Sequence, residues 1–142
     1  MTALKKNLLL VVLIGLICPG LLFAGDTISS TTTPVYGVNG NIDVTNVIEY
    51  SGKISAMAIK ISLPENAEFV SASCDVSPAI APRKGDTGLL EFAWITTPKS
   101  PFAFTYSVAT FDNAAGEIFT EINYRRDSGP LYHSLTPVPV SK

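Results

Sequence analysis

The stretch that decides the fold is Phe102-Ala103-Phe104-Thr105-Tyr106-Ser107-Val108, in which large apolar side chains alternate with small ones. Successive side chains of a β-strand point to opposite faces of the sheet, so a period of two predicts a strand with one buried and one exposed face. This is the most regular alternation in the sequence. Residues 102–108 therefore predict a strand whose aromatic side chains enter a core.

Weaker versions of the same pattern lie on both sides of this strand. Met57, Ile59, Ile61 and Leu63 alternate with smaller or polar residues, and the run ends at Pro64, as a half-buried strand does before a turn. In full, the predicted strands are residues 42–50, 57–63, 69–74, 90–94, 102–108 and 118–124, and a short edge strand near 131–135.

Turn signals separate these strands at the spacing typical of an all-β domain. Residues 113–116, Asn-Ala-Ala-Gly, are typical of a hairpin turn, and residues 75–88, with two prolines and two glycines, predict a long irregular connection. After residue 24 no window has apolar residues at helical spacing. Six or seven strands without a helix predict an all-β fold, a two-sheet antiparallel β-sandwich. Its core volume is expected from Phe69, Phe92, Trp94, Phe102, Phe104 and Tyr106.

The first 24 residues have the three parts of a secretory signal peptide. A short basic start ends at Lys5-Lys6, an apolar run follows, and Pro19-Gly20 breaks it before Ala24 at the predicted cleavage point. A spanning helix needs roughly 20 apolar residues without such a break, which disfavours a membrane anchor. We expect a signal peptide over 1–24, a flexible Ser/Thr-rich lead-in over 25–40, the sandwich over 41–136 and a tail over 137–142, in a secreted or periplasmic protein.

Composition limits the function of the mature chain. Of 142 residues, 46% are hydrophobic and 15% charged, and much of the apolar excess lies in the signal segment. Removing that segment, with Lys5 and Lys6, leaves 118 residues with 8 Lys/Arg against 12 Asp/Glu, a formal charge of -4. This length suits one domain, and a mildly acidic chain lacks the basic face that nucleic-acid binding needs. The partners we expect are therefore proteins or polysaccharides.

Cysteine usage leaves one alternative open. Cys18 belongs to the signal segment, so the mature chain keeps only Cys74 and has no intramolecular disulfide. An odd cysteine in an oxidising compartment is either buried as a small hydrophobe or available for an intermolecular bond. We expect burial.

Residues 42–126 resemble secreted bacterial β-sandwich modules of the cohesin-like and immunoglobulin-like kind. The resemblance is carried by residues 56–65 (AMAIKISLPE), which lead to 69–72 (FVSA), by 88–94 (GLLEFAW) and by 101–108 (PFAFTYSV). It implies a module that spaces, adheres or docks within extracellular assemblies, without catalysis.

Candidate catalytic and metal-binding residues lack the context that their chemistry needs. Asp86-Thr87-Gly88 matches the tripeptide of aspartic proteases, but a basic segment precedes it, and a turn before the next strand explains it. His133 has no ligand or triad spacing around it and is expected at the surface. Neither Ser107 nor Ser134 lies in a G-x-S-x-G turn. The loop aspartates, which form no EF-hand and are expected to be solvated, are Asp75, Asp86, Asp112 and Asp127.

Aromatic residues are the remaining candidates for ligand contact. Trp94 is in phase with Phe92 and is assigned to the core, whereas Tyr36, Tyr50, Tyr124 and Tyr132 are the better candidates for an exposed sugar-binding surface. We expect a non-catalytic secreted binding or structural module without a cofactor, which mediates protein–protein or cell-surface interaction. The alternatives are a carbohydrate-binding module and a subunit of an extracellular assembly formed by strand addition.

Overall fold

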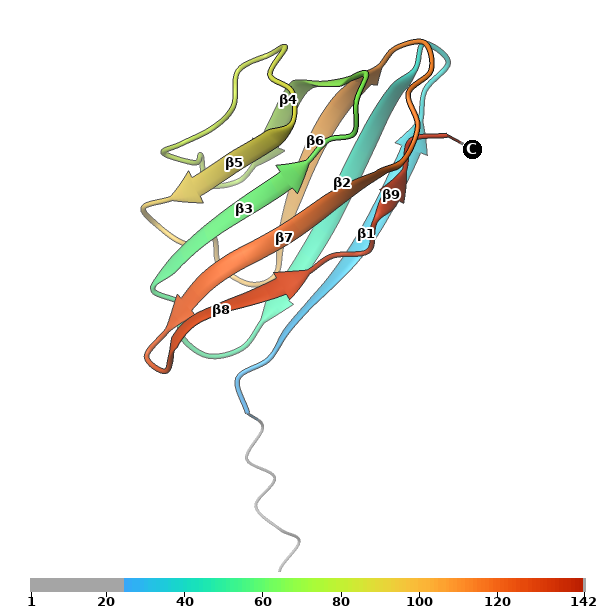
Figure 1. Ribbon diagram of the computed structural model, residues 1–142. Coiled ribbons are helices and arrows are strands. Elements are labelled where there is room, and N and C mark those ends of the chain that lie inside the picture. The colour runs from blue at the N-terminus through green and yellow to red at the C-terminus, as the bar shows by residue number, and fades with distance from the viewer. Residues whose placement is uncertain (1–24, 142) are drawn as a thin grey trace, which may run out of the picture.

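The computed structural model describes residues 25–141, and its regular elements are all β-strands (Figure 1). The predicted signal peptide lies outside the described residues. Residues 25–141 contain no helix with the length and hydrophobicity of a membrane span. The strands are β1 (Ile28–Tyr36), β2 (Asn41–Tyr50), β3 (Ala56–Ser62), β4 (Ala67–Cys74), β5 (Leu89–Trp94), β6 (Phe102–Thr110), β7 (Glu117–Arg126), β8 (Gly129–Ser134) and β9 (Val138–Pro139).

The strands form two antiparallel sheets that pack face to face (Figure 1). Sheet A has the order β1-β2-β6-β4, and sheet B has the order β5-β3-β7-β8, with β9 paired to the start of β7. The prediction of a two-sheet antiparallel β-sandwich is therefore confirmed. The irregular connection over 75–88 crosses from β4 in sheet A to β5 in sheet B.

Side chains from the inner faces of both sheets fill the core. All six aromatic residues predicted for it are buried, and the rings of Phe92 and Phe104 meet edge to face across the two sheets, with centroids 4.9 Å apart. Trp94 is also buried, and its Nε1 donates to the Val76 carbonyl at 2.8 Å. Burying each such ring stabilises the fold by about 1.5–3 kcal/mol, so this cluster is a major stabilising term.

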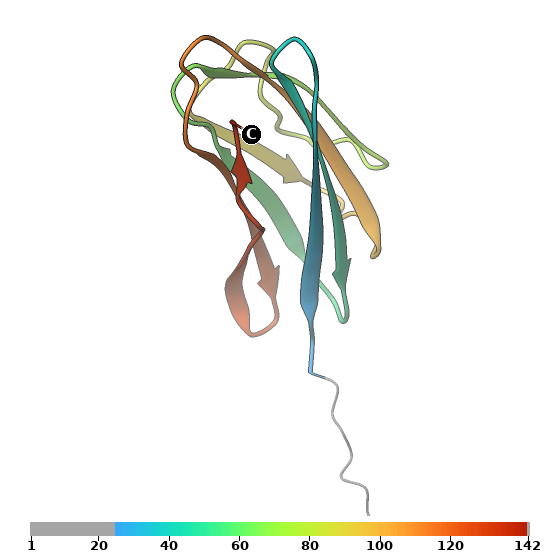
Figure 2. The same ribbon diagram turned by 90° about the vertical axis from the view of Figure 1, so that its right-hand side faces the viewer.

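The two sides of the sandwich are closed differently. On one side the β1 edge of sheet A meets β8 and β9 of sheet B, where His133 Nε2 lies 2.9 Å from Ser30 Oγ and the Tyr36 hydroxyl donates to the Pro139 carbonyl at 2.7 Å. Figure 2 looks onto this side and shows β1 and β9 facing each other. On the other side, the connection over 75–88 lies beside β4 and β5 (Figure 1).

The expected flexible lead-in is largely a strand, which corrects the prediction for residues 25–40. β1 pairs with β2 along its whole length, from Ile28 opposite Tyr50 to Tyr36 opposite Ile42. The half-buried inward side chains in the middle of the strand, Ser30 and Thr32, are polar, so this part lacks the apolar alternation by which sequence analysis detects strands. The strand forms because its backbone completes the edge of sheet A.

The predicted tail over 137–142 also belongs in part to the domain. Val138 and Val140 are buried, and the Val140 amide donates to the Gly116 carbonyl at 3.1 Å. A two-residue strand is too short to show a period of two, so its sequence gave no strand signal.

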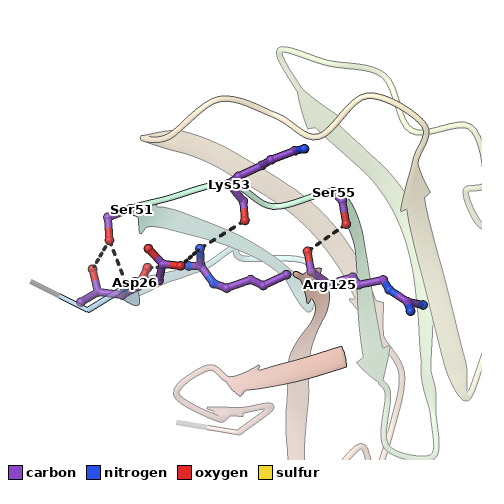
Figure 3. Close-up of polar contacts among 7 residues, drawn as sticks. Asp26, Ser51, Lys53, Ser55 and Arg125 are labelled. Atoms are coloured by element: carbon purple, nitrogen blue, oxygen red, sulfur yellow. Dashed lines mark hydrogen bonds and ion pairs between the residues drawn. The ribbon is translucent and has the colours of Figure 1, made fainter. Parts of the chain in front are cut away.

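Arg126, the last residue of β7, fastens the segment that leads into β1. Its buried guanidinium lies 3.5 Å from an Asp26 carboxylate oxygen and donates to the carbonyls of Thr27, at 3.1 Å, and Lys53, at 3.4 Å. The Thr27 amide in turn donates to Ser51 Oγ at 2.9 Å. Figure 3 shows how Asp26 meets the β2–β3 connection that carries Ser51 and Lys53.

Candidate functional site

Two of the tyrosines proposed for ligand contact lie at opposite ends of the β1–β2 hairpin. Tyr36 pairs with Ile42 beside the hairpin turn, and Tyr50 pairs with Ile28 at the far end. The eight residue steps from Ile28 to Tyr36 span about 26 Å, so these rings cannot contact one small ligand together. Both pack against the core, and the Tyr50 hydroxyl donates to the Pro98 carbonyl at 2.6 Å. Their contacts are those of rim packing.

The other two tyrosines lie on opposite faces of sheet B. Tyr124 points inward from β7, is half-buried against the core, and lies with its ring centroid 5.5 Å from the Arg126 guanidinium carbon. Tyr132 is opposite Asn123 on the outer face and is 71% exposed. The structure therefore does not bring the four tyrosines together, and of the four only Tyr132 offers a largely open ring.

His133 lies between the two sheets. It is half-buried, and the contact of its Nε2 with Ser30 joins β8 to β1. His133 therefore links two strands, whereas the sequence predicted a surface histidine. No group of three or more His, Cys, Asp and Glu residues within 25–141 could hold a metal ion. The loop aspartates Asp75, Asp112 and Asp127 are exposed there.

Asp86 has a local role in the chain. Its Oδ2 accepts a hydrogen bond from the Arg83 amide at 2.8 Å, and the Asp86 amide donates back to the Arg83 carbonyl at 3.0 Å. Gly85 has a φ of 93°, a left-handed conformation that glycine adopts without strain. The tripeptide at 86–88 thus lies in a turn that leads into β5, as its sequence context predicts.

Cys74 is half-buried at the end of β4. Desolvation by burial raises the pKa of its thiol, and the neighbouring Val76 and Asp75 amides oppose that shift in part. Its position is intermediate between the core cysteine we expected and a fully accessible thiol.

The outer face of sheet B carries the candidate site. Leu89 of β5 and Phe119 of β7 both lie directly opposite Ser62 of the intervening β3, with 64% and 54% of their surfaces exposed. They border a surface hollow of about 510 Å³, which Leu135 and Pro137 also line. Because most large apolar side chains in this domain are buried, two that stand outward on either side of a serine form a distinct apolar surface.

A row of charges borders this apolar surface. Lys60, the next outward residue of β3 after Ser62, lies opposite both Glu91 of β5 and Glu121 of β7. The row therefore runs acid, base, acid across the sheet. The Asn123 amide donates to Glu121 Oε1 at 2.9 Å, which fixes that carboxylate. An apolar patch beside an ordered charged row can give both binding energy and orientation.

Beyond the charged row the face becomes flat. Ala93, Ala58 and Asn123 lie side by side on β5, β3 and β7, with Tyr132 at one end of the row and Ile80, 58% exposed, bridged to Ala93 at the other. Small side chains let a partner approach the sheet closely, and the two large side chains bound the contact area. These residues face outward together only because of the strand order.

The outer face of sheet A is different in character. Thr33, Thr45, Thr105 and Ser73 follow one another across its four strands, and the Thr45 and Thr105 hydroxyls are 3.2 Å apart. Short hydroxyl side chains offer little apolar area, so sheet B has the stronger features of a docking face. Sequence analysis did not select Leu89 and Phe119, although a large apolar residue at an outward position of a predicted strand was the available signal.

Comparison with known proteins does not identify a function for this surface. No protein family model matches the sequence, and no curated protein matches it. A crystal structure of a DUF4466 family protein from Parabacteroides merdae ATCC 43184 superimposes with a TM-score of 0.46 and 14% sequence identity, covering 82% of this chain and 45% of that chain. This chain thus spans less than half the length of that protein.

Proposed function

We propose that this chain is a non-catalytic, secreted binding module of the cohesin-like or immunoglobulin-like kind, which docks a protein partner on the outer face of sheet B. The observation that carries the proposal is the exposure of Leu89 and Phe119 on either side of Ser62. Burying what is exposed of these two side chains would contribute about 1–2 kcal/mol each. Aromatic side chains in the centre of a desolvated patch are typical binding hot spots.

The charged row supports a protein partner in particular. Glu91 and Glu121 flank Lys60, so a complementary surface needs a basic group on each side of an acidic one, and it needs an apolar projection one strand step away. Such an arrangement is ordinary on a protein surface. The signal-like pattern of residues 1–24 supports a secreted or periplasmic location for this encounter.

Site-specific photo-crosslinking tests the proposal in cells of the producing organism. A photoreactive phenylalanine at position 119 should give an adduct with one protein, and the same group at Val35, 60% exposed on the outer face of sheet A, should not. With that protein purified, Phe119→Ser should weaken binding at least 10-fold, about 1.4 kcal/mol, while Val35→Ser changes it less than twofold. Equal adducts at both positions, or none at 119, contradict the proposal.

Carbohydrate binding is the second candidate, and the exposed ring of Tyr132 beside Asn123 favours it. An exposed aromatic face next to a side-chain amide can stack on a sugar ring and bond its hydroxyls. Affinity electrophoresis against a panel of polysaccharides should then show retardation that Tyr132→Ala removes. If no polysaccharide retards the protein, this candidate is excluded. Sedimentation of the mature chain over a range of concentrations tests the third candidate, a self-assembling subunit, which requires association.

A further inference from the structure

We propose that the free edge of β4, from Ser71 to Cys74, accepts an extended peptide of a partner protein as an additional strand of sheet A. This edge lies on the side of the sandwich between the sheets, away from the outer face of sheet B, so the proposal does not depend on the function proposed above. Strand addition of this kind uses main-chain hydrogen bonds for affinity and pockets for alternate side chains for specificity.

The backbone direction along β4 follows from the hydrogen bonds of Phe69. Its amide donates to the Asp86 carbonyl and its carbonyl accepts from the Gly85 amide, both at 2.8 Å. Both groups therefore point away from β6, and Phe69 and Val108 are a non-hydrogen-bonded pair of the ladder. At this point the 75–88 connection covers the β4 edge.

Past Phe69 the edge is open. The register shifts between Phe69 and Ser71, so the next opposed pair, Ser71 and Ser107, is a hydrogen-bonded one. The alternation then makes Ala72 opposite Tyr106, and Cys74 opposite Phe104, non-hydrogen-bonded pairs. The amides and carbonyls of Ala72 and Cys74 consequently point to the free side of the sheet, where no described strand pairs with β4.

A hollow of about 620 Å³ lies along this open edge, within the size range of ligand pockets. Its floor includes the core rings Phe69, Phe92 and Phe104, and the residues opposite the edge belong to the connection, at 77–84. That connection is held away from the edge, because Ile80 pairs with Ala93 of β5. The space beside β4 is thus bounded on both sides.

Proteins normally block strand edges, and β1 and β5 each carry a block at one point of their edge. Pro34 of β1 lies opposite Val44 in a non-hydrogen-bonded pair, so its missing N–H is on the free side, and Ile80 covers Ala93 on β5. By contrast, residues 71–73 of β4 are Ser-Ala-Ser, exposed, uncharged and too small to obstruct a neighbour. The β4 edge from Ser71 to Cys74 therefore carries no such block.

The lining of the hollow specifies the peptide. Ala72 and Cys74 face inward, so an added strand would place alternate side chains over the phenylalanine floor, and these should be apolar. Lys84 is the one charged residue in the described lining, which favours a carboxylate on the peptide. We expect a segment of about five residues in which apolar side chains alternate with polar ones and at least one polar residue is acidic.

An mRNA-displayed library of random ten-residue peptides, selected on residues 25–142, tests the proposal. Enriched peptides should show this alternation. Ala72→Pro removes an N–H from the free side without removing a β6 hydrogen bond, and it should weaken those peptides at least 10-fold. The control Ser30→Pro removes the corresponding N–H at the β1 edge, together with the Ser30 hydroxyl that contacts His133, and should alter peptide affinity less than twofold.

Backbone methylation of the peptide gives a readout that leaves the protein unchanged. N-methylation of one alternate set of peptide amides should weaken binding at least 10-fold, and methylation of the other set should change it little, because only one set faces β4. Phe119→Ser should leave peptide binding intact, which separates this site from the outer face of sheet B. Absence of enrichment, equal binding by Ala72→Pro, or equal effects of the two methylation sets would overturn the proposal.

Discussion

The guanidinium of Arg126 lies 3.5 Å from the carboxylate of Asp26 and thereby joins the last residue of β7 to the segment before β1. The two partners are unequal, since the Arg126 side chain is 5% exposed and that of Asp26 is 58% exposed. Arg126 also donates to two backbone carbonyls, and these hydrogen bonds compensate its buried charge for the loss of water. The arginine therefore matters more for stability than the ion pair itself.

Substitution at these two positions should separate the two contributions. Arg126→Ala removes the charged hydrogen bonds and the contact with Tyr124, and it should lower the free energy of unfolding by about 2–3 kcal/mol. Asp26→Asn weakens only a largely exposed pair and should cost less than about 1 kcal/mol. Urea unfolding of residues 25–142 measures both values. A loss with Asp26→Asn as large as that with Arg126→Ala would contradict this assignment.

Amide exchange should show an alternating pattern along β1. The Gly37 amide donates to the Asn41 carbonyl, so Gly37 and Asn41 are a hydrogen-bonded pair, and the alternation makes Ser29, Thr31 and Thr33 donors to β2. The amides of Ser30 and Thr32 point to the free edge. Exchange followed by NMR should find the first set protected and the second set fast. Uniformly fast exchange over β1 would contradict the strand and support the prediction that residues 25–40 are flexible.

Tyr106 should make stability fall at alkaline pH. Desolvation by burial raises the pKa of its phenol to about 12, against an ordinary value of 10.0, and a hydrogen bond to Thr120 partly opposes this. Because the folded pKa is the higher one, the contribution of Tyr106 is fully present below pH 10 and is lost as the pH rises from 10 to about 12. The loss should approach about 1.4 kcal/mol per pH unit.

Tyr106→Phe is the matched variant for this measurement. Urea unfolding at pH 8, 10 and 11 should show a smaller decline for Tyr106→Phe than for the unsubstituted chain. At pH 8 the variant should lose less than about 1.5 kcal/mol, because the hydroxyl contact to Thr120 Oγ1 is long, at 3.4 Å. Parallel declines in the two proteins would show that other groups control the alkaline limit.

Asn46 is a polar residue in the core whose replacement should stabilise the domain. It is fully buried, its Oδ1 accepts from Thr32 Oγ1 at 2.8 Å, and its Nδ2 has no hydrogen-bond partner among the described residues. Replacing both partners by Asn46→Leu with Thr32→Val removes the unsatisfied amide and should raise the unfolding free energy by about 1 kcal/mol or more.

The single variants provide the comparison. Asn46→Leu alone leaves the Thr32 hydroxyl without its acceptor, so it should be less stable than the double variant. Thermal unfolding of the four proteins forms a double-mutant cycle that measures the coupling. A double variant less stable than the original chain would mean that the amide has a partner that stabilises it.

The sequence predicted the seven strands from β2 to β8, because side-chain alternation within a strand is a local property. Residues 102–108, for example, form most of β6, from its first residue onward, with Phe104 and Tyr106 facing inward, as their spacing indicates. The core aromatics followed for the same reason. The turn assignment of 86–88 was also correct, since an aspartate that accepts a bond from a nearby amide acts within a few residues.

The sequence could not predict β1 or the candidate sites. Two polar inward residues of β1, Ser30 and Thr32, contact His133 and Asn46, and Ser30 and His133 are 103 positions apart in the chain. Likewise, Leu89 and Phe119 flank Ser62 only because β3 lies between β5 and β7. Which residues face each other across a sheet, and which strand edge stays open, depends on strand order, and contacts distant in sequence determine that order.

What the sequence by itself determined was the class of the fold and the inward face of most strands, because the direction of a side chain in a strand is set by its nearest neighbours. The tertiary structure alone decided that a Ser/Thr-rich segment becomes an edge strand, that an apolar pair stands on the outer face of sheet B, and that β4 keeps an open edge. These features arise from packing and hydrogen bonds between segments that no local period relates.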